Sequence, residues 1–203
     1  MIILLNCTLA LLALINPVSK IFVLSTLAEE ADSRELRRIS LKASMIAGAI
    51  LLIFALSGKF ILQTIFHVQL YSFQIVGGIV LFARGFMALN KGLFFETEAN
   101  QKLEDASIVP LASPMIAGPA TLSAAISFPV QYGLGRTLTA IIIAVTVNLL
   151  VMIYSQKIGS VLKRQNLMGA LIRITGLIVA TIGVQMMLEG ILAYLSVSGI
   201  IVN

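Results

Sequence analysis

The residues of this chain that are suited to binding a solute gather at two places where proline interrupts a long apolar run. Proline removes a backbone donor and clashes with the preceding turn, so a helix does not pass through it unbroken. Each interruption frees backbone amides and carbonyls within apolar sequence, and short polar side chains add further hydrogen-bonding groups. The candidate substrate-binding residues are Asn16, Pro17, Ser113, Pro114, Gly118, Pro119, Ala120 and Thr121.

Freed backbone groups of this kind suit a small zwitterion. Amides at a helix N-terminus attract a carboxylate, and carbonyls at a C-terminus attract an ammonium group or a cation. We expect Pro17 to start a second half-helix with Asn16 as its N-cap. Gly118 leaves space that favours a solute of the size of glycine or alanine. The alternative at both breaks is a kink that only packs against other helices.

Ionisable residues offer little further chemistry. Glu189 is the only carboxylate inside an apolar run, so it is the candidate coupling residue, with exposure at the membrane interface as the alternative. Cys7 is the only cysteine and His67 the only histidine, which argues against a metal site. No set of nucleophile, base and orienting group is recognisable, so we expect no catalytic residues, no cofactor and no enzyme.

The composition indicates a membrane protein. The 203 residues are 59% hydrophobic and 11% charged, with a mean hydropathy of +1.02. A soluble domain of this size has too little interior for so much apolar surface, so the lipid bilayer is the expected surrounding. The basic residues lie in short links between apolar runs, which predicts membrane orientation and argues against a nucleic-acid partner.

Six apolar runs predict an all-α protein with six transmembrane segments. A single helix over the fourth run would measure about 45 Å against a hydrocarbon core of roughly 30 Å, so this segment is expected to enter, break and resume. The first and fourth segments are therefore the broken ones. The six predicted segments are 1–28, 43–65, 70–90, 106–135, 137–156 and 167–195.

The two halves of the chain resemble each other. A slide of about 98 positions brings Asn16-Pro17 onto Ser113-Pro114 and Ser57 onto Ser155. Each half holds three segments, so the second half enters the membrane from the opposite face and the repeats are inverted. We expect one membrane domain, 1–203, made of repeat 1–95, a polar link 96–105 and repeat 106–203.

The distribution of basic residues predicts the orientation. The links after the first, third and fifth segments hold nine Lys and Arg residues, whereas the other links hold only Lys59 and Arg136. Lys and Arg are retained on the cytoplasmic side. Both termini are therefore expected outside.

Several stretches resemble the MarC-type integral membrane proteins, also described as a small neutral-amino-acid transporter family related to LysE-type exporters. They are LINPV (14–18), SFQIVGGIVLF (72–82), IVPLASPMIAGP (108–119), RITGLI (173–178) and QMMLEG (185–190). The resemblance implies six spans, the inner membrane of a prokaryote, and transport of small neutral amino acids such as glycine or alanine.

The chain departs from the family pattern at three positions. Phe22 stands where a second proline is usual, Ala120 replaces a glycine, and Lys20 is an unusual base near the first break. Lys20 either snorkels inward from the end of the first segment, favours an anionic solute or replaces a coupling cation. The favoured function is a secondary transporter of small neutral amino acids. A channel or passive facilitator for small solutes is the alternative.

Overall fold

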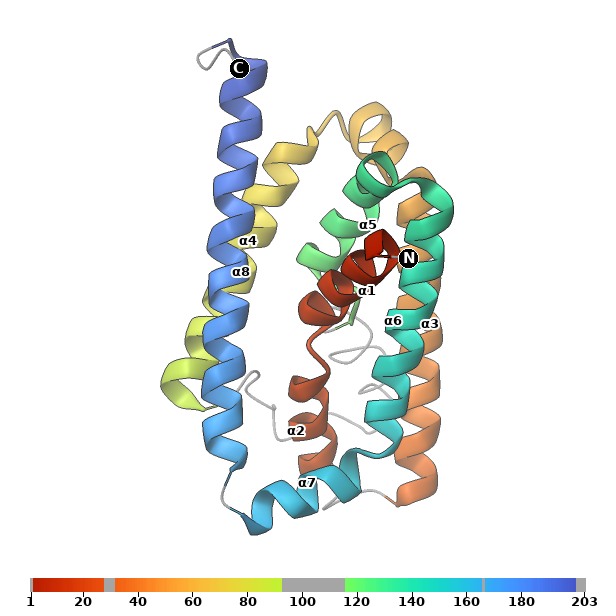
Figure 1. Ribbon diagram of the computed structural model, residues 1–203, viewed down its shortest axis with the longest axis vertical. Coiled ribbons are helices and arrows are strands. Elements are labelled where there is room, and N and C mark those ends of the chain that lie inside the picture. Colours follow the sequence, from red (N-terminus) through yellow and green to blue (C-terminus); the bar gives the residue numbers. More distant parts are fainter. Residues whose placement is uncertain (1, 28–31, 93–115, 166, 200–203) are drawn as a thin grey trace.

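The computed structural model describes residues 2–27, 32–92, 116–165 and 167–199, and these residues form helices joined by short turns (Figure 1). No strand occurs within these ranges, which confirms the predicted all-α class. The elements are α1 (Ile2–Ile15), α2 (Pro17–Leu27), α3 (Ser33–Phe60), the π-helix η1 (Ile61–Ile65), α4 (Leu70–Lys91), α5 (Pro119–Tyr132), α6 (Leu134–Ile153), α7 (Ser155–Arg164) and α8 (Met168–Val197).

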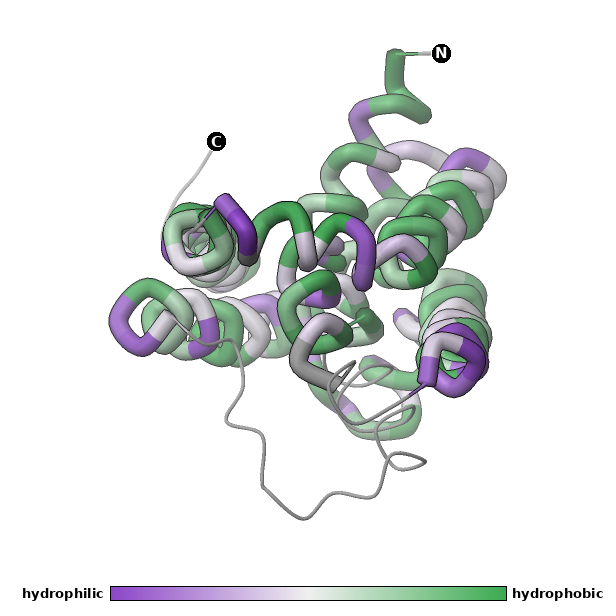
Figure 2. The backbone as a smooth tube through the Cα atoms, turned by 90° about the horizontal axis from the view of Figure 1, so that it is seen from below, coloured by the Kyte–Doolittle hydropathy of each residue, from purple (hydrophilic) through white to green (hydrophobic). Residues whose placement is uncertain are grey.

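Five stretches of the described chain are long and apolar enough to cross a membrane. They are Ile2–Ser25, Ser33–Ile65, Leu70–Lys91, Leu134–Ile153 and Met168–Val197. In Figure 2 most of the helical tube carries the colour of hydrophobic residues. By contrast, α5 has 14 residues and measures about 21 Å, less than the roughly 30 Å of a hydrocarbon core. The protein is therefore a multi-pass membrane protein with several apolar helices.

The predicted break in the first segment is confirmed. α1 ends at Ile15 and α2 begins at Pro17, so proline occupies the first helical position, where its missing N–H costs no hydrogen bond. Asn16 differs from the prediction, because it has a φ of 54° rather than the extended conformation usual for an N-cap. Asparagine is one of the few residues that adopt this left-handed conformation at small cost. The chain thereby changes direction within one residue.

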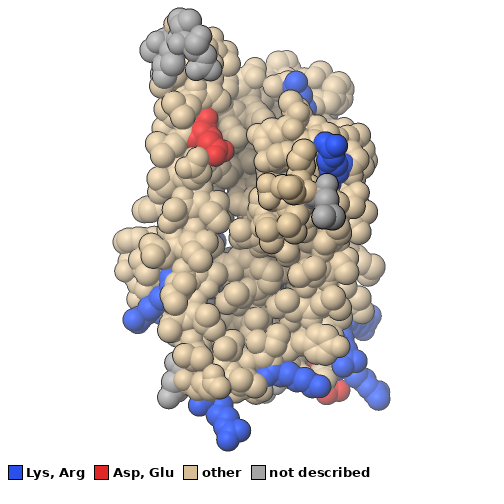
Figure 3. Space-filling view, in the orientation of Figure 1, with Lys and Arg blue, Asp and Glu red and all other residues tan. Residues whose placement is uncertain are grey.

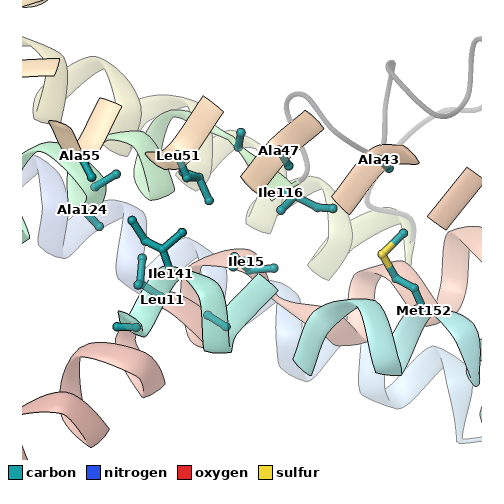
Figure 4. Close-up of a cluster of buried hydrophobic side chains, with 14 of the residues drawn as sticks. Leu11, Ile15, Ala43, Ala47, Leu51, Ala55, Ile116, Ala124, Ile141 and Met152 are labelled. Carbon is teal, nitrogen blue, oxygen red and sulfur yellow. The ribbon is translucent and has the colours of Figure 1, made fainter. Parts of the chain in front are cut away.

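One apolar core is shared by α1, α3, α5 and α6 and includes Leu24 of α2, and we call it the core bundle (Figure 4). Small side chains of α3 let the neighbouring helices approach, and Ala43 and Ala47 are both fully buried. Ile15 at the end of α1 and Ile116 just before α5 belong to this core. The residues that flank both helix breaks are therefore held by tight packing.

α4 and α8 form an antiparallel pair that is held together by glycine. A Cβ atom on Gly78 would lie 2.5 Å from the carbonyl oxygen of Gly183, and one on Gly85 would lie 2.4 Å from the backbone nitrogen of Ala180. Backbones this close leave no room for a larger residue, as is common at helix contacts in membranes. The rings of Tyr71 and Tyr194 also meet, with centroids 5.5 Å apart. We call this unit the α4–α8 pair.

Candidate functional site

Both helix breaks open onto one small cavity, which we call the break cavity. Its volume is about 70 Å³, and it lies between the core bundle and the α4–α8 pair. The first break contributes Leu14, Ile15, Asn16, Ser19 and Lys20, the second contributes Gly118, Pro119, Ala120 and Thr121, and the α4–α8 pair contributes Val80, Leu81, Arg84 and Val179.

The structure brings together most of the residues that the sequence singled out. Asn16 and the four residues from Gly118 to Thr121 line the break cavity, although they come from opposite halves of the chain. Pro17 opens α2 and is not among the lining residues. Ser113 and Pro114 lie outside the described residues. That these residues bind a solute stays a prediction.

At the first break, side chains of the following turn satisfy the carbonyls that the helix cannot. The hydroxyl of Ser19 donates to the carbonyl oxygen of Asn16 at 2.7 Å. The ammonium group of Lys20 donates to the carbonyl oxygen of Ile15, and only 1% of this lysine is exposed. A buried charge is costly unless it has hydrogen-bonding partners. The break therefore places the amino group of Lys20 at the edge of the cavity.

At the second break, the side chain of Thr121 satisfies the backbone carbonyls that the helix leaves without donors. Its hydroxyl donates to the carbonyl oxygens of Ile116 at 2.7 Å and of Gly118 at 2.9 Å. Gly118 is the N-cap of α5 and supplies no side chain. Pro119 has no N–H group. The N–H of Leu122 donates to the carbonyl oxygen of Gly118 at 2.9 Å. The N–H groups of Ala120 and Thr121 have no partner inside α5, because the first turn of a helix lacks acceptors.

The two breaks share a local pattern that the sequence comparison missed. In Asn16-Pro17-x-Ser19 and in Gly118-Pro119-x-Thr121, the hydroxyl two residues after the proline donates to the carbonyl of the residue before it. The sequence alignment instead paired Asn16-Pro17 with Ser113-Pro114. The signal for this structural match is a proline that follows Asn or Gly and is itself followed, two residues later, by Ser or Thr. Aligning the two halves of the chain for the best overall agreement does not find it.

The break cavity is electropositive. Lys20 and Arg84 both line it, and no Asp or Glu is found among its described lining residues. The N-terminus of α5 adds the partial positive charge of its amides. Arg84 was not among the predicted site residues, although an arginine six residues inside the segment 70–90 was a signal for it. The arrangement is suited to a carboxylate or another small anion.

A larger cavity adjoins the first, and we call it the Glu189 cavity. It has a volume of about 290 Å³ and shares Leu14 and Ala120 with the break cavity. Glu189, the predicted coupling residue, lines it on α8. Within the described part of the chain, no group of three His, Cys, Asp or Glu side chains is placed to hold a metal ion.

Comparison with known proteins gives a consistent family assignment. The family described as MarC family integral membrane protein matches residues 1–195. UPF0056 membrane protein PH0214 of Pyrococcus horikoshii is 33% identical over 92% of each chain. UPF0056 membrane protein MJ1677 of Methanocaldococcus jannaschii is 31% identical over 90% of this chain and 92% of its own.

A bacterial relative, UPF0056 membrane protein YvbG of Bacillus subtilis, is 28% identical over 90% of each chain. No solved structure matches the chain. The matched residues, 1–195, include all the residues that line the two cavities. The chain belongs to the MarC family of integral membrane proteins.

Proposed function

We propose that this protein is a secondary transporter of small neutral amino acids across the cytoplasmic membrane of a prokaryote, with the solute held in the break cavity. The observation that carries the proposal is the meeting of two helix breaks at one electropositive cavity whose polar residues Asn16, Lys20 and Thr121 are buried. Broken helices of this kind form the solute sites of many transporters.

The chemistry of the break cavity favours a solute with a carboxylate. The N–H groups of Ala120 and Thr121 and the ammonium of Lys20 supply donors from two directions. Each donor is fixed by its own part of the fold, so little ordering is needed when the solute binds. Asn16 adds a side chain with both donor and acceptor atoms for the remaining groups of the solute.

The volume of the cavity favours a small solute. A cavity needs about 10–15 Å³ of this kind of volume to hold one water molecule, so about 70 Å³ holds a group of roughly five heavy atoms. Glycine and alanine are of this size, whereas a long or aromatic side chain would have to displace Leu14, Val80 or the backbone at Gly118.

The arrangement of helices supports the proposed inverted repeat. We propose that α1 to α4 form the first repeat and that α5, α6 and α8 belong to the second, with α5 as the outer half of a sixth segment. The antiparallel α4–α8 pair then joins the third segments of both repeats. Because both cavities lie between this pair and the core bundle, a rocking motion of one against the other is suited to opening them in turn.

The surface charge supports the proposed orientation. In Figure 3 several Lys and Arg side chains gather at the lower end of the molecule, where α7 and the start of α3 lie. Cytoplasmic links are enriched in these residues. The proposal therefore has this end in the cytoplasm and both termini outside.

Uptake of radiolabelled glycine into vesicles that contain the purified protein tests the proposal. We expect saturable uptake that alanine inhibits strongly and acetate inhibits weakly, because acetate retains the carboxylate but lacks the ammonium group. Methylamine, which lacks the carboxylate, should not compete. Flux that rises linearly with concentration would indicate a channel instead, and competition by methylamine equal to that by alanine would contradict carboxylate recognition.

A further inference from the structure

The Glu189 cavity carries a set of oxygen-bearing side chains that the proposed solute site does not use. Three helices contribute them: Gln74 from α4, Ser123 and Ser127 from α5, and Gln185 and Glu189 from α8. The remaining lining residues are apolar. Gln185 and Glu189 are exposed whereas Ser123 is buried, so the cavity opens at the surface and extends inward to Ser123. Polar side chains that gather around one cavity of a membrane protein indicate a ligand rather than packing.

Glu189 is the only charged residue among the described residues that line this cavity. One of its carboxylate oxygens, Oε1, accepts a hydrogen bond of 2.8 Å from the side-chain nitrogen of Gln185, one turn earlier on α8. This bond orients the carboxylate and leaves the carbonyl oxygen of Gln185 as a further acceptor. One carboxylate balances one positive charge, so a monovalent cation is the matching ligand.

Ser123 supplies the second, independent observation. Only 3% of this residue is exposed, and its hydroxyl oxygen has no hydrogen-bond partner among the described residues. Buried polar groups in folded proteins nearly always have a partner, so this hydroxyl group requires one. One turn later, the hydroxyl of Ser127 donates to the backbone carbonyl oxygen of Ser123 at 2.9 Å. The lone pairs of the Ser127 hydroxyl oxygen therefore remain available to a ligand.

The ammonium group of a solute bound in the break cavity does not reach Glu189. On α8 the break cavity is lined by Val179 and the second cavity extends to Glu189, ten residues further on. Ten residues of α-helix span about 15 Å, whereas the two charged groups of a small amino acid are only a few ångströms apart. The ligand of Glu189 is therefore a separate species.

We propose that the Glu189 cavity binds Na⁺, with oxygens of Glu189, Ser123 and Gln74 as ligands. Carboxylate, hydroxyl and amide oxygens are the hard donors that such cations prefer. A role of this ion in driving solute movement rests on the proposed function. The binding of Na⁺ does not, because the residues that form this cavity bind the ion whether or not a solute is transported.

Thermal unfolding of the purified full-length protein tests the proposal without any amino acid present. We compare NaCl with choline chloride at equal ionic strength. A ligand that binds only the folded state raises the melting temperature, here by about 5 °C at saturating Na⁺. Glu189→Gln should abolish this rise. Glu35→Gln, the same change in the first turn of α3 and away from the cavity, should retain it.

Ser123→Ala is the second test variant, because removing one hydroxyl group from a helix preserves the fold. We expect it to weaken Na⁺ binding about tenfold. Ser57→Ala, which removes a hydroxyl that only bonds Ile53 on its own helix, is the matched control and should bind Na⁺ like the wild type.

Three results would overturn the proposal. They are equal stabilisation by choline and Na⁺, a Na⁺ effect that survives in Glu189→Gln, and stabilisation by glycine alone that depends on Glu189. The outcome is distinguishable from that of the transport assay. Na⁺ binding without glycine uptake would retain this site and refute the proposed function, whereas uptake without Na⁺ binding would do the reverse.

Discussion

At the scale of single residues, side chains at each break supply the hydrogen-bond donors that an unbroken helix would supply from its backbone. Lys20 and Ser19 satisfy carbonyls at the first break, and Thr121 satisfies them at the second. The sequence predicted where the helices end, because proline acts locally. It did not predict the task of Lys20, because that bond depends on the left-handed conformation of Asn16.

The positive charge of Lys20 is expected to bind the solute carboxylate. Lys20→Gln keeps an N–H donor for the carbonyl of Ile15 but removes the charge, so the protein should fold while glycine binding weakens at least about tenfold. Glycine-dependent thermal stabilisation measures this loss. Lys42→Gln removes an exposed charge on α3 and serves as control. Unchanged glycine binding in Lys20→Gln would exclude the lysine from the site.

The hydroxyl of Thr121 is expected to stabilise the fold. Thr121→Val has nearly the same shape but leaves the carbonyls of Ile116 and Gly118 without this donor, which should lower the free energy of unfolding by about 1–3 kcal/mol. Thr146→Val, at an exposed threonine that bonds Ile142 on its own helix, should cost less than about 0.5 kcal/mol. Equal effects in a denaturation series would contradict this role.

At the scale of helices, glycine determines which elements pair. A pair such as Gly77-Gly78 is typical of close contact between membrane helices, but a stretch of small residues does not indicate which helix is the partner. The partner is α8, where Gly176 and Gly183 face α4 across a backbone contact. Sequence alone did not predict this pairing, because it joins segments that are far apart in the chain and is decided by shape.

A methyl group at this contact should separate the two helices. A Cβ atom at Gly85 would lie 2.4 Å from backbone of α8, so Gly85→Ala should destabilise the protein by about 1–3 kcal/mol. At Gly169, also on α8, nothing lies within 4 Å of the added atom, and alanine favours a helix there by up to about 1 kcal/mol. A melting temperature for Gly85→Ala that equals or exceeds that of Gly169→Ala would contradict the close contact between α4 and α8.

At the scale of the whole molecule, composition and apolar length predicted a multi-pass helical membrane protein. Five of the six predicted segments correspond to helices long enough to span a membrane, as for α4 at Leu70–Lys91 against 70–90. The second of these begins at Ser33 rather than at residue 43, and the predicted fourth segment is not among the five. The two cavities were not predictable as shapes, because each is lined by helices from both halves of the chain. Asn16 and the residues from Gly118 to Thr121 were predictable because proline and glycine mark the breaks directly, whereas the lining residues from the α4–α8 pair were not among the predicted site residues.

The proposed orientation predicts which positions a membrane-impermeant thiol reagent reaches. In a Cys7→Ala background, His67→Cys should react from outside, because it lies in the exposed turn between η1 and α4. Arg37→Cys, near the start of α3, should react only after the membrane is permeabilised. The opposite pattern of labelling would reverse the orientation, and labelling of both positions from one side would contradict the odd number of segments in each repeat.

The central claim is that the break cavity holds the transported solute, and glycine uptake by a Gly118→Leu variant tests it most directly. Gly118 has a φ of −81°, so leucine fits the backbone there, and its side chain would enter a cavity of only about 70 Å³. Gly135→Leu, with nothing within 4 Å of its added Cβ, is the control. We predict that Gly118→Leu inserts, folds and transports nothing, while Gly135→Leu transports normally. Normal uptake by folded Gly118→Leu would contradict the account.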